Sequence, residues 1–222
     1  MKPLSRIITA LAAILLATPL AVSAQGQIYG KLNTAYALAG IINPQVEVVL
    51  SERMSFQTEL VYSPWKYIVY RGVNRPMRFV IFSNETRMFL HHPTQGWYAG
   101  LNLGFQGFNM TKPDFSGGRI GLEEGHSGKG YGLQAGMSIG YQWTFTERWL
   151  LDAYAGFGYQ ISWYNSYYYN TPGIPNGTIE DVPHGHDPNA AHDPWNASAE
   201  WGPNKAGVSI GYRIFSPHPK HS

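Results

Sequence analysis

The chain has 222 residues and contains no cysteine, so no disulfide bond can hold its fold. Only 14% of its residues are charged, well below the roughly 25% of an average soluble domain, whereas 14% are aromatic. Two of its 16 basic residues, Lys2 and Arg6, lie in an N-terminal segment without acidic residues, so the remaining chain carries 14 basic and 14 acidic residues. A neutral chain gives no electrostatic reason to expect binding to nucleic acid.

Residues 1–24 have the organisation of a secretory signal peptide. Two positive charges precede a short apolar run, and the run ends at Val22-Ser23-Ala24, the small-residue pattern that a signal peptidase cleaves. The alternative is a retained membrane anchor, but the apolar run is short for the about 20 residues that span a bilayer. We therefore predict a cleaved signal peptide at 1–24, one folded domain over 25–215 and a short C-terminal tail at 216–222.

Beyond residue 24, apolar residues alternate with small or polar residues. In 131–143 every odd position is apolar, whereas the even positions hold only Gly, Gln and Ser. A period of two places one kind of side chain on each face of a β-strand. A helix would instead bring Gln134 and Met137 onto one stripe. The predicted strands are 31–38, 45–50, 54–62, 78–90, 97–106, 131–143, 149–163 and 205–215.

The connections between these segments alternate between short turns and longer loops. The short turns are 51–53, 91–96 and 145–148, and the longer loops are 63–76, 111–129 and 165–204. The connection at 40–44 is short although it lies on the side of the longer loops. This alternation is typical of bacterial outer-membrane barrels. We predict an all-β fold, an eight-stranded antiparallel up-and-down transmembrane β-barrel with both termini in the periplasm and a long external loop before the last strand.

One face of the predicted strands is nearly free of charge, and the other carries four acidic and four basic residues. These are Lys31, Glu47, Glu59, Glu85, Arg87, Asp152, Lys205 and Arg213. Because Arg or Lys near the middle of a bilayer costs about 2–4 kcal/mol, we expect the charged face to point into the barrel. Eight strands leave room for side chains but not for an aqueous channel. We favour a static network that fills the interior, and the alternative is a path for protons or ions.

Aromatic residues lie beside the predicted connections. Trp97 and Trp149 follow short turns, whereas Tyr62, Trp65 and Trp163 flank longer loops. These positions predict aromatic girdles at the two interfaces of a membrane.

Several short motifs accompany this pattern of strands. They include Glu85-Thr86-Arg87, Gly96-Trp97-Tyr98-Ala99-Gly100-Leu101, Gly140-Tyr141-Gln142-Trp143 and Gly156-Phe157-Gly158-Tyr159. With these motifs, the chain from about Lys31 to Tyr164 resembles the DUF3575 family of Bacteroidetes outer-membrane proteins, a domain of unknown function. The resemblance implies an eight-stranded barrel and, for some members, a genetic neighbourhood of fimbrial genes. It implies no catalytic residues.

The predicted loop at 165–204 contains the leading candidate for a metal site, ahead of His91 and His92 in a predicted short turn. His184, His186 and His192 lie there among Asp, Pro and Asn residues, and imidazole and carboxylate groups are ligands for Zn or Cu. The alternative, which we favour, is a solvated loop that tolerates histidine, because the chain offers no Cys and no second fixed cluster. We therefore expect no cofactor.

A lipid-modifying enzyme would need a nucleophile, a base and an acid at the outer edge of the membrane. Ser166, His126 and Asp181 lie near predicted external loops, but no spacing ties them together. We expect a non-enzymatic barrel in the outer membrane with a structural or surface-interaction role through its external loops. The alternatives are an accessory role in fimbrial or other surface assembly and lipid modification. The expected partners are outer-membrane lipid, the machinery that inserts barrels and a surface or fimbrial protein, with no nucleic acid.

Overall fold

The computed structural model describes residues 26–70, 73–111, 113–114, 121–122, 126–169, 179–183 and 196–216. The predicted signal peptide at 1–24 and residues 217–222 of the predicted tail lie outside these ranges. Within the described part of the chain, no helix has the length and apolar character needed to cross a membrane.

The described part of the chain consists mainly of β-strands, with one short helix. The elements are β1 (Ile28–Asn33), α2 (Thr34–Leu38), β2 (Pro44–Val49), β3 (Met54–Ser63), β4 (Tyr67–Tyr70), β5 (Val73–Phe89), β6 (Gly96–Met110), β7 (Pro113–Asp114), β8 (Gly121–Leu122), β9 (His126–Thr144), β10 (Trp149–Tyr169), β11 (Ile179–Pro183) and β12 (Asn196–Phe215).

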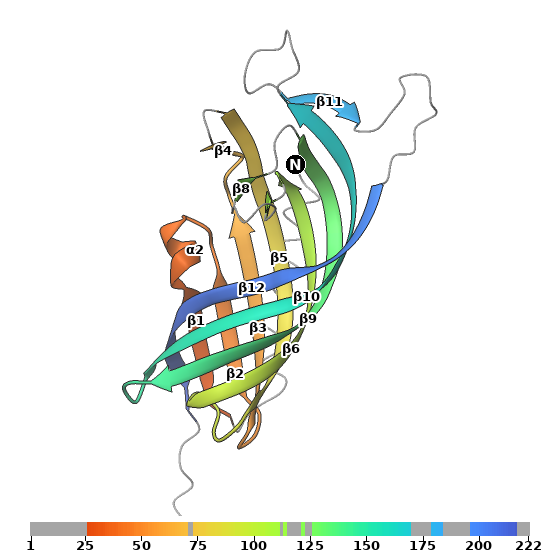
Figure 1. The fold of residues 1–222 in the computed structure, drawn as a ribbon. Helices are drawn as coiled ribbons and strands as arrows, with labels where there is room; N and C mark the ends of the chain where they lie inside the picture. The colour runs from red at the N-terminus through yellow and green to blue at the C-terminus, as the bar shows by residue number, and fades with distance from the viewer. Residues whose placement is uncertain are drawn as a thin grey trace, which may run out of the picture.

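Eight of these strands close into a ring in which every neighbouring pair is antiparallel (Figure 1). The order is β1-β2-β3-β5-β6-β9-β10-β12, and β12 pairs with β1 to close the ring. Chain order and spatial order are therefore the same. The short strands β4 and β11 extend the sheet beside β5 and β10, and β7 pairs with β8 in a separate sheet. The predicted all-β, antiparallel architecture is confirmed.

The hydrogen-bond register is strongly staggered around the ring. Starting at Lys31 and following paired residues through all eight strands leads to Glu200 on β12. The direct partner of Lys31 on β12 is instead Gly211, eleven residues further along the chain. A closed sheet with such a stagger must tilt its strands, by about 35–45° in known cases. Because the strands are tilted, residues at very different positions along their own strands lie at the same height in the ring.

A β-bulge in β12 accounts for one residue of this stagger. Gly156 pairs with Lys205, but the next residue of β10, Phe157, pairs with Pro203, so Asn204 is the extra residue. Because the bulge shifts the alternation by one position, Asn204 and Lys205 both point into the ring. On either side of the bulge, side chains still alternate between the inner and the outer face of the ring.

The wall of the ring is lower at β1 than elsewhere. β1 ends at Asn33, which pairs with Ser209, so the part of β12 from 196 to 208 has only β10 as a paired neighbour among the described strands. Helix α2 lies beside this edge, and the Thr34 hydroxyl donates a hydrogen bond of 2.8 Å to the carbonyl of Val208. Figure 1 shows α2 well below the upper ends of β9, β10 and β12.

The structure corrects the predicted boundary of the first strand. The segment 31–38 was expected to be a strand throughout, but its second half is α2. The side chain of Asn33 accepts hydrogen bonds from the backbone N–H groups of Ala35 and Tyr36, at 3.0 and 3.2 Å, and so caps a helix. A run of five residues is too short for its periodicity to separate a strand from a helical turn.

The predicted longer loops are also partly strand. β10 continues to Tyr169 and β12 begins at Asn196, so both ends of the predicted loop 165–204 belong to the sheet. β4 and the start of β5 occupy much of 63–76, and β9 already begins at His126 within 111–129. Apolar and polar residues do not alternate strictly in these strand ends, as in 164–169, so the sequence pattern stops short of them.

The two faces of the ring have opposite polarity. The inner face buries charged and amide side chains, including Arg87 and Asp152, which are both fully covered. The outer face exposes large apolar side chains, and Leu101 and Met137 are 66% and 67% exposed. A small buried cluster of Phe89, Tyr98 and Tyr154 provides the apolar part of the interior.

Candidate functional site

Seven of the eight charged residues predicted to face the interior meet there in one ion-paired cluster. They come from six strands and are Lys31, Glu47, Glu59, Glu85, Arg87, Asp152 and Lys205. Alternation along each strand points them inward, and the stagger of the ring brings them to a common height. We refer to these seven residues as the ionic cluster.

Asp152 and Glu47 share two cations at the centre of the ionic cluster. The Lys31 ammonium donates to both carboxylates, with Nζ 2.7 Å from Oε2 of Glu47. Nη1 of Arg87 lies 2.7 Å from Asp152 and 3.4 Å from Glu47. The Tyr98 hydroxyl donates to the other oxygen of Asp152 at 2.9 Å. Because β5 and β10 are not neighbours, the pair of Arg87 and Asp152 spans the interior.

Glu85 and Glu59 form the second half of the cluster around Lys205. The Lys205 ammonium donates to Glu85 and lies 3.2 Å from Oε2 of Glu59. Nε of Arg87 lies 2.7 Å from Glu85, which links the two halves. Glu59 also accepts from the amide of Asn43 at 2.9 Å. Each carboxylate thus has at least two donors, which is how a buried charge is stabilised.

Two tyrosines cover the cations of the cluster. The guanidinium of Arg87 lies 4.5 Å from the ring centroid of Tyr98 and 6.0 Å from that of Tyr154. The ammonium of Lys205 lies 5.1 Å from the Tyr154 ring. At these distances the aromatic faces attract the cations. Neither tyrosine was predicted from the sequence to take part, although each stands on the inner face of its strand.

Arg213, the eighth predicted residue, does not join the cluster. It lies on the inner face of β12 further toward the chain end, beside the hydroxyl of Tyr29. The seven clustered residues comprise four acids and three bases, so they carry one net negative charge. Among the described residues Arg213 forms no ion pair with the cluster.

Glycines on the inner face provide the space for these side chains. A Cβ atom at Gly100 would lie 2.7 Å from Oε1 of Glu85, and one at Gly211 would lie 2.8 Å from Cγ of Lys31. A Cβ at Gly156 would meet Cγ of Lys205 at 2.8 Å. These distances are shorter than carbon–carbon or carbon–oxygen contacts allow. The glycines on the inner face are therefore sites where a long side chain from another strand packs directly against the backbone of the ring.

Neutral amides fill the interior above the ionic cluster. Asn204, the bulged residue, donates to Asn102 at 2.7 Å and so bridges β12 and β6 across two intervening strands. The amide of Gln106 donates to the Ser162 hydroxyl at 3.4 Å, and Gln160 donates to the same oxygen at 3.0 Å. The interior is therefore crossed at several heights by direct side-chain contacts.

Tyr36 in α2 lies outside the ring strands, and its ionisation is also changed. Burial, and to a smaller extent the negative charge of Glu59, raise the pKa of Tyr36 to about 12. Tyr36 is thus uncharged at neutral pH and lies near the edge of the ionic cluster.

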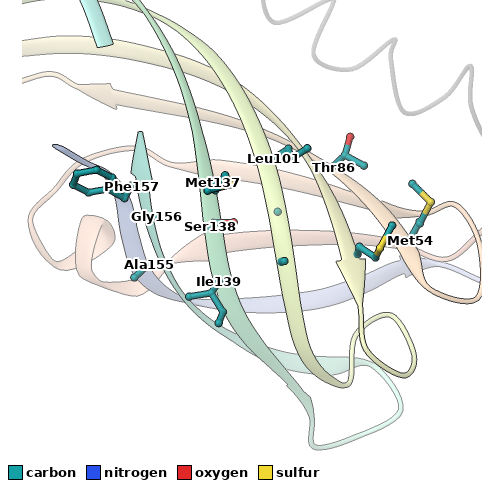
Figure 2. Close-up of a pocket in the computed structure, with 12 residues that line it drawn as sticks. Met54, Thr86, Leu101, Met137, Ser138, Ile139, Ala155, Gly156 and Phe157 are labelled. Carbon is teal, nitrogen blue, oxygen red and sulfur yellow. The ribbon is translucent and has the colours of Figure 1, made fainter. Parts of the chain in front are cut away.

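The outer face carries an apolar groove of about 720 Å³ (Figure 2). Small side chains at Ala99 and Ala155 alternate with larger ones at Met88, Ile139 and Phe157. Figure 2 shows Met137, Ile139 and Phe157 projecting from neighbouring strands on this face. The groove offers apolar contact and no ionisable group.

The other predicted site residues are not placed by the structure. His184, His186 and His192 lie outside the described residues, and so the predicted metal site does too. Among the residues that are described, no group of three His, Cys, Asp or Glu side chains is arranged to hold a metal ion. Ser166, His126 and Asp181 were the candidates for a lipid-modifying centre, and their side chains also lie outside the part of the chain that the structure describes.

A comparison with models of protein families found a match. The DUF3575 family, described as a protein of unknown function, matches residues 10–183. No curated protein and no solved structure matches the chain.

Proposed function

The chain belongs to the DUF3575 family of proteins of unknown function, and we propose that it is a non-enzymatic transmembrane β-barrel of a bacterial outer membrane. In this proposal residues 1–24 direct export, the eight-stranded ring spans the membrane, and the external connections act on a surface partner. The outer membrane and a Bacteroidetes origin are parts of the same proposal.

The reversed polarity of the ring is the observation that carries this proposal. In water, a fold gains stability by burying apolar side chains, at about 25 cal/mol per Å². This ring instead exposes Leu101, Leu103, Met137 and Ile139 and buries its charges. Contiguous exposed apolar surfaces of this kind mark contact with lipid or protein. Up to the pair of Asn33 and Ser209 the ring is closed, and its backbone hydrogen bonds are made between strands, as hydrocarbon requires.

The height of the apolar band supports a membrane-spanning role. On the outer face of β9 the terminal aromatic residues are Tyr131 and Trp143, twelve residues apart. At about 3.4 Å per residue and a tilt of about 40°, they are separated by roughly 31 Å along the ring axis. Outer-membrane barrels have an apolar band about 25 Å tall between two aromatic girdles.

Further aromatic pairs gather at both ends of this band. At the end with the short turns, Trp149 and Tyr212 lie 4.9 Å apart between ring centroids. At the other end, Tyr131 and Trp163 lie 5.6 Å apart. Trp and Tyr prefer such interfacial positions because they are apolar with one polar group.

The ionic cluster argues for a structural rather than a conducting barrel. Its side chains meet across the interior in direct ion pairs, and each carboxylate already has its donors. Moving a solute past them would require breaking several buried pairs, each costing about 3–5 kcal/mol. We therefore place the function at the external end, in the connections between strands.

Fractionation of cells that express the full chain tests this proposal. We expect the protein in the outer membrane, and we expect the purified domain to need detergent and to migrate differently on gels before and after heating. Recovery of the mature polypeptide as a compact monomer without detergent would overturn the proposal.

Deleting residues 170–195 tests the role of the external connection. This deletion spares β10 and β12, whereas the wider deletion of 166–201 suggested by the predicted loop would remove ring strand. We expect the shortened barrel to fold and to lose its surface partner in proximity labelling on intact cells. A fimbrial protein among the lost partners would favour a role in surface assembly, and altered lipid in a knockout would favour lipid modification. An unchanged set of partners would contradict a role for this connection.

A further inference from the structure

Two exposed cations break the apolar character of the outer face. They are Arg78 on β5 and Lys129 on β9. Among the ring residues whose side chains are described, these are the charged residues that point outward. Within the same part of the chain, neither has an ion-pair partner. Unpaired cations on an apolar wall are costly unless an anion lies beside them.

The register places these cations in one row across neighbouring strands. Arg78 pairs with Asn109 on β6, and Asn109 pairs with Lys129 on β9. With a spacing of about 4.8 Å between strands, the backbones of Arg78 and Lys129 are about 10 Å apart, with the Asn109 amide between them. We refer to these three residues as the basic row.

The basic row lies immediately beyond the upper aromatic residues. The next outward row toward the middle of the band contains Val80, Gly107, Tyr131 and Trp163. The row after it contains Phe82, Phe105 and Leu133, and Phe105 stacks on Tyr131 with ring centroids 6.5 Å apart. A molecule lying along these rows would meet cations, then aromatic rings, then apolar side chains.

An anionic lipid would match this order, with its charged headgroup at the cations and its acyl chains at the apolar side chains. On the basis of the proposed function, we propose that the basic row binds the phosphate of a lipid headgroup in the outer leaflet. Arg78 donates two parallel hydrogen bonds to phosphate oxygens, Lys129 supplies a second positive charge and the Asn109 amide donates between them. The acyl chains of the lipid lie over Phe105 and Leu133.

Lipid binding by the refolded full domain tests this proposal through native mass spectrometry from detergent micelles. The probes are lipid A, phosphatidylglycerol and zwitterionic phosphatidylcholine, each compared in the wild type and in the Arg78→Gln, Lys129→Gln and double variants. We expect binding of a phosphate-bearing anionic lipid to weaken about fivefold in each single variant and roughly thirtyfold in the double variant. Phosphatidylcholine binding should be weak and unchanged. The stronger of the two anionic lipids identifies the headgroup.

The matched control is Arg148→Gln, which removes an exposed arginine from the turn at the opposite end of the ring, where it donates to Tyr212 at 3.0 Å. It should leave lipid binding unchanged. Equal weakening in this variant, no weakening in the double variant, or full competition by inorganic phosphate would each overturn the proposal. Circular dichroism and heat-dependent migration of the same samples report folding in detergent. If the barrel folds in detergent but all variants bind lipid equally, only the basic row is contradicted. If the protein folds without detergent, the proposed function is contradicted.

Discussion

Lys31 on β1 and Asp152 on β10 form an ion pair across 121 residues of sequence, in the middle of the ring. Both side chains are completely covered. Asp152 also accepts from Arg87 and from the Tyr98 hydroxyl, so this one carboxylate joins β10 to three other strands. A buried charge in this position stabilises the fold only while its partners are present.

Replacing Asp152 by Asn should therefore strongly destabilise the ring. The change leaves Glu47 as the only carboxylate that Lys31 and Arg87 share, and each of these buried cations loses one of its carboxylate partners. We expect a loss of about 3–5 kcal/mol in the free energy of unfolding, measured by urea titration in lipid vesicles. Glu147→Gln, in an exposed turn, should change it by less than about 0.5 kcal/mol. A loss below about 1 kcal/mol for the Asp152 variant would show that the cluster is hydrated and weakly coupled.

Two glycines provide a matched test of packing in the interior. A Cβ at Gly100 would lie 2.5 Å from Oγ of Ser138 and 2.7 Å from Oε1 of Glu85, whereas one at Gly202 has nothing within 4 Å. We expect Gly100→Ala to cost about 1–3 kcal/mol because Glu85 has to move. Gly202→Ala should be neutral or slightly stabilising, since alanine reduces the freedom of the unfolded chain. Equal effects in thermal unfolding would mean that Glu85 can give way without loss.

A charge on the outer face should act according to its height. Met137 is 67% exposed near the middle of the apolar band, and we expect Met137→Arg to destabilise the membrane-inserted protein by about 2–4 kcal/mol. The same substitution at Thr146, in a turn at the end of the band, should cost less than about 1 kcal/mol. Vesicle-based unfolding measures both variants. In a water-soluble protein the two substitutions would both be nearly neutral, and this result would contradict a membrane location.

The bulge at Asn204 allows a deletion to be absorbed. Removing Asn204 makes Lys205 and Pro203 consecutive, and these residues already pair with the consecutive residues Gly156 and Phe157. The deletion should preserve the ring and cost about 1–3 kcal/mol through the lost bond to Asn102. Deleting Ala206 instead shifts the register by one residue and reverses the faces of one part of β12. We expect that variant not to assemble, as judged by heat-dependent migration on gels. Equal yields would show that β12 tolerates either register.

Alternation in the sequence was sufficient to predict most of the ring. It identified eight strands in chain order and separated their two faces, and it did so best in β9, where every inward residue from Gly132 to Gln142 is small or an amide. The upper half of β12 was missed because the extra residue at Asn204 shifts the alternation by one. The helix α2 was missed because its start depends on a side-chain cap at Asn33 rather than on a periodic pattern.

Height within the ring could not be predicted from the sequence. The pattern correctly put Arg213 on the same face of β12 as Lys205, but it does not say which residues of different strands lie at one level. That depends on the stagger, which brings Lys31 opposite Gly211 and leaves Arg213 beside Tyr29. The same stagger forms the basic row, because Arg78 and Lys129 have no relationship in sequence that indicates their neighbourhood.

The distribution of charges between the two ends of the chain has a consequence for biogenesis. Glu59 and Glu85, made early, receive Lys205 from the final strand, while Asp152, made late, receives Lys31 from the first. A nascent chain that lacks either end holds surplus charge that no partial sheet can neutralise. Closure of the first strand onto the last is therefore also the step that completes charge pairing, and truncated chains should stall before it and be accessible to proteases.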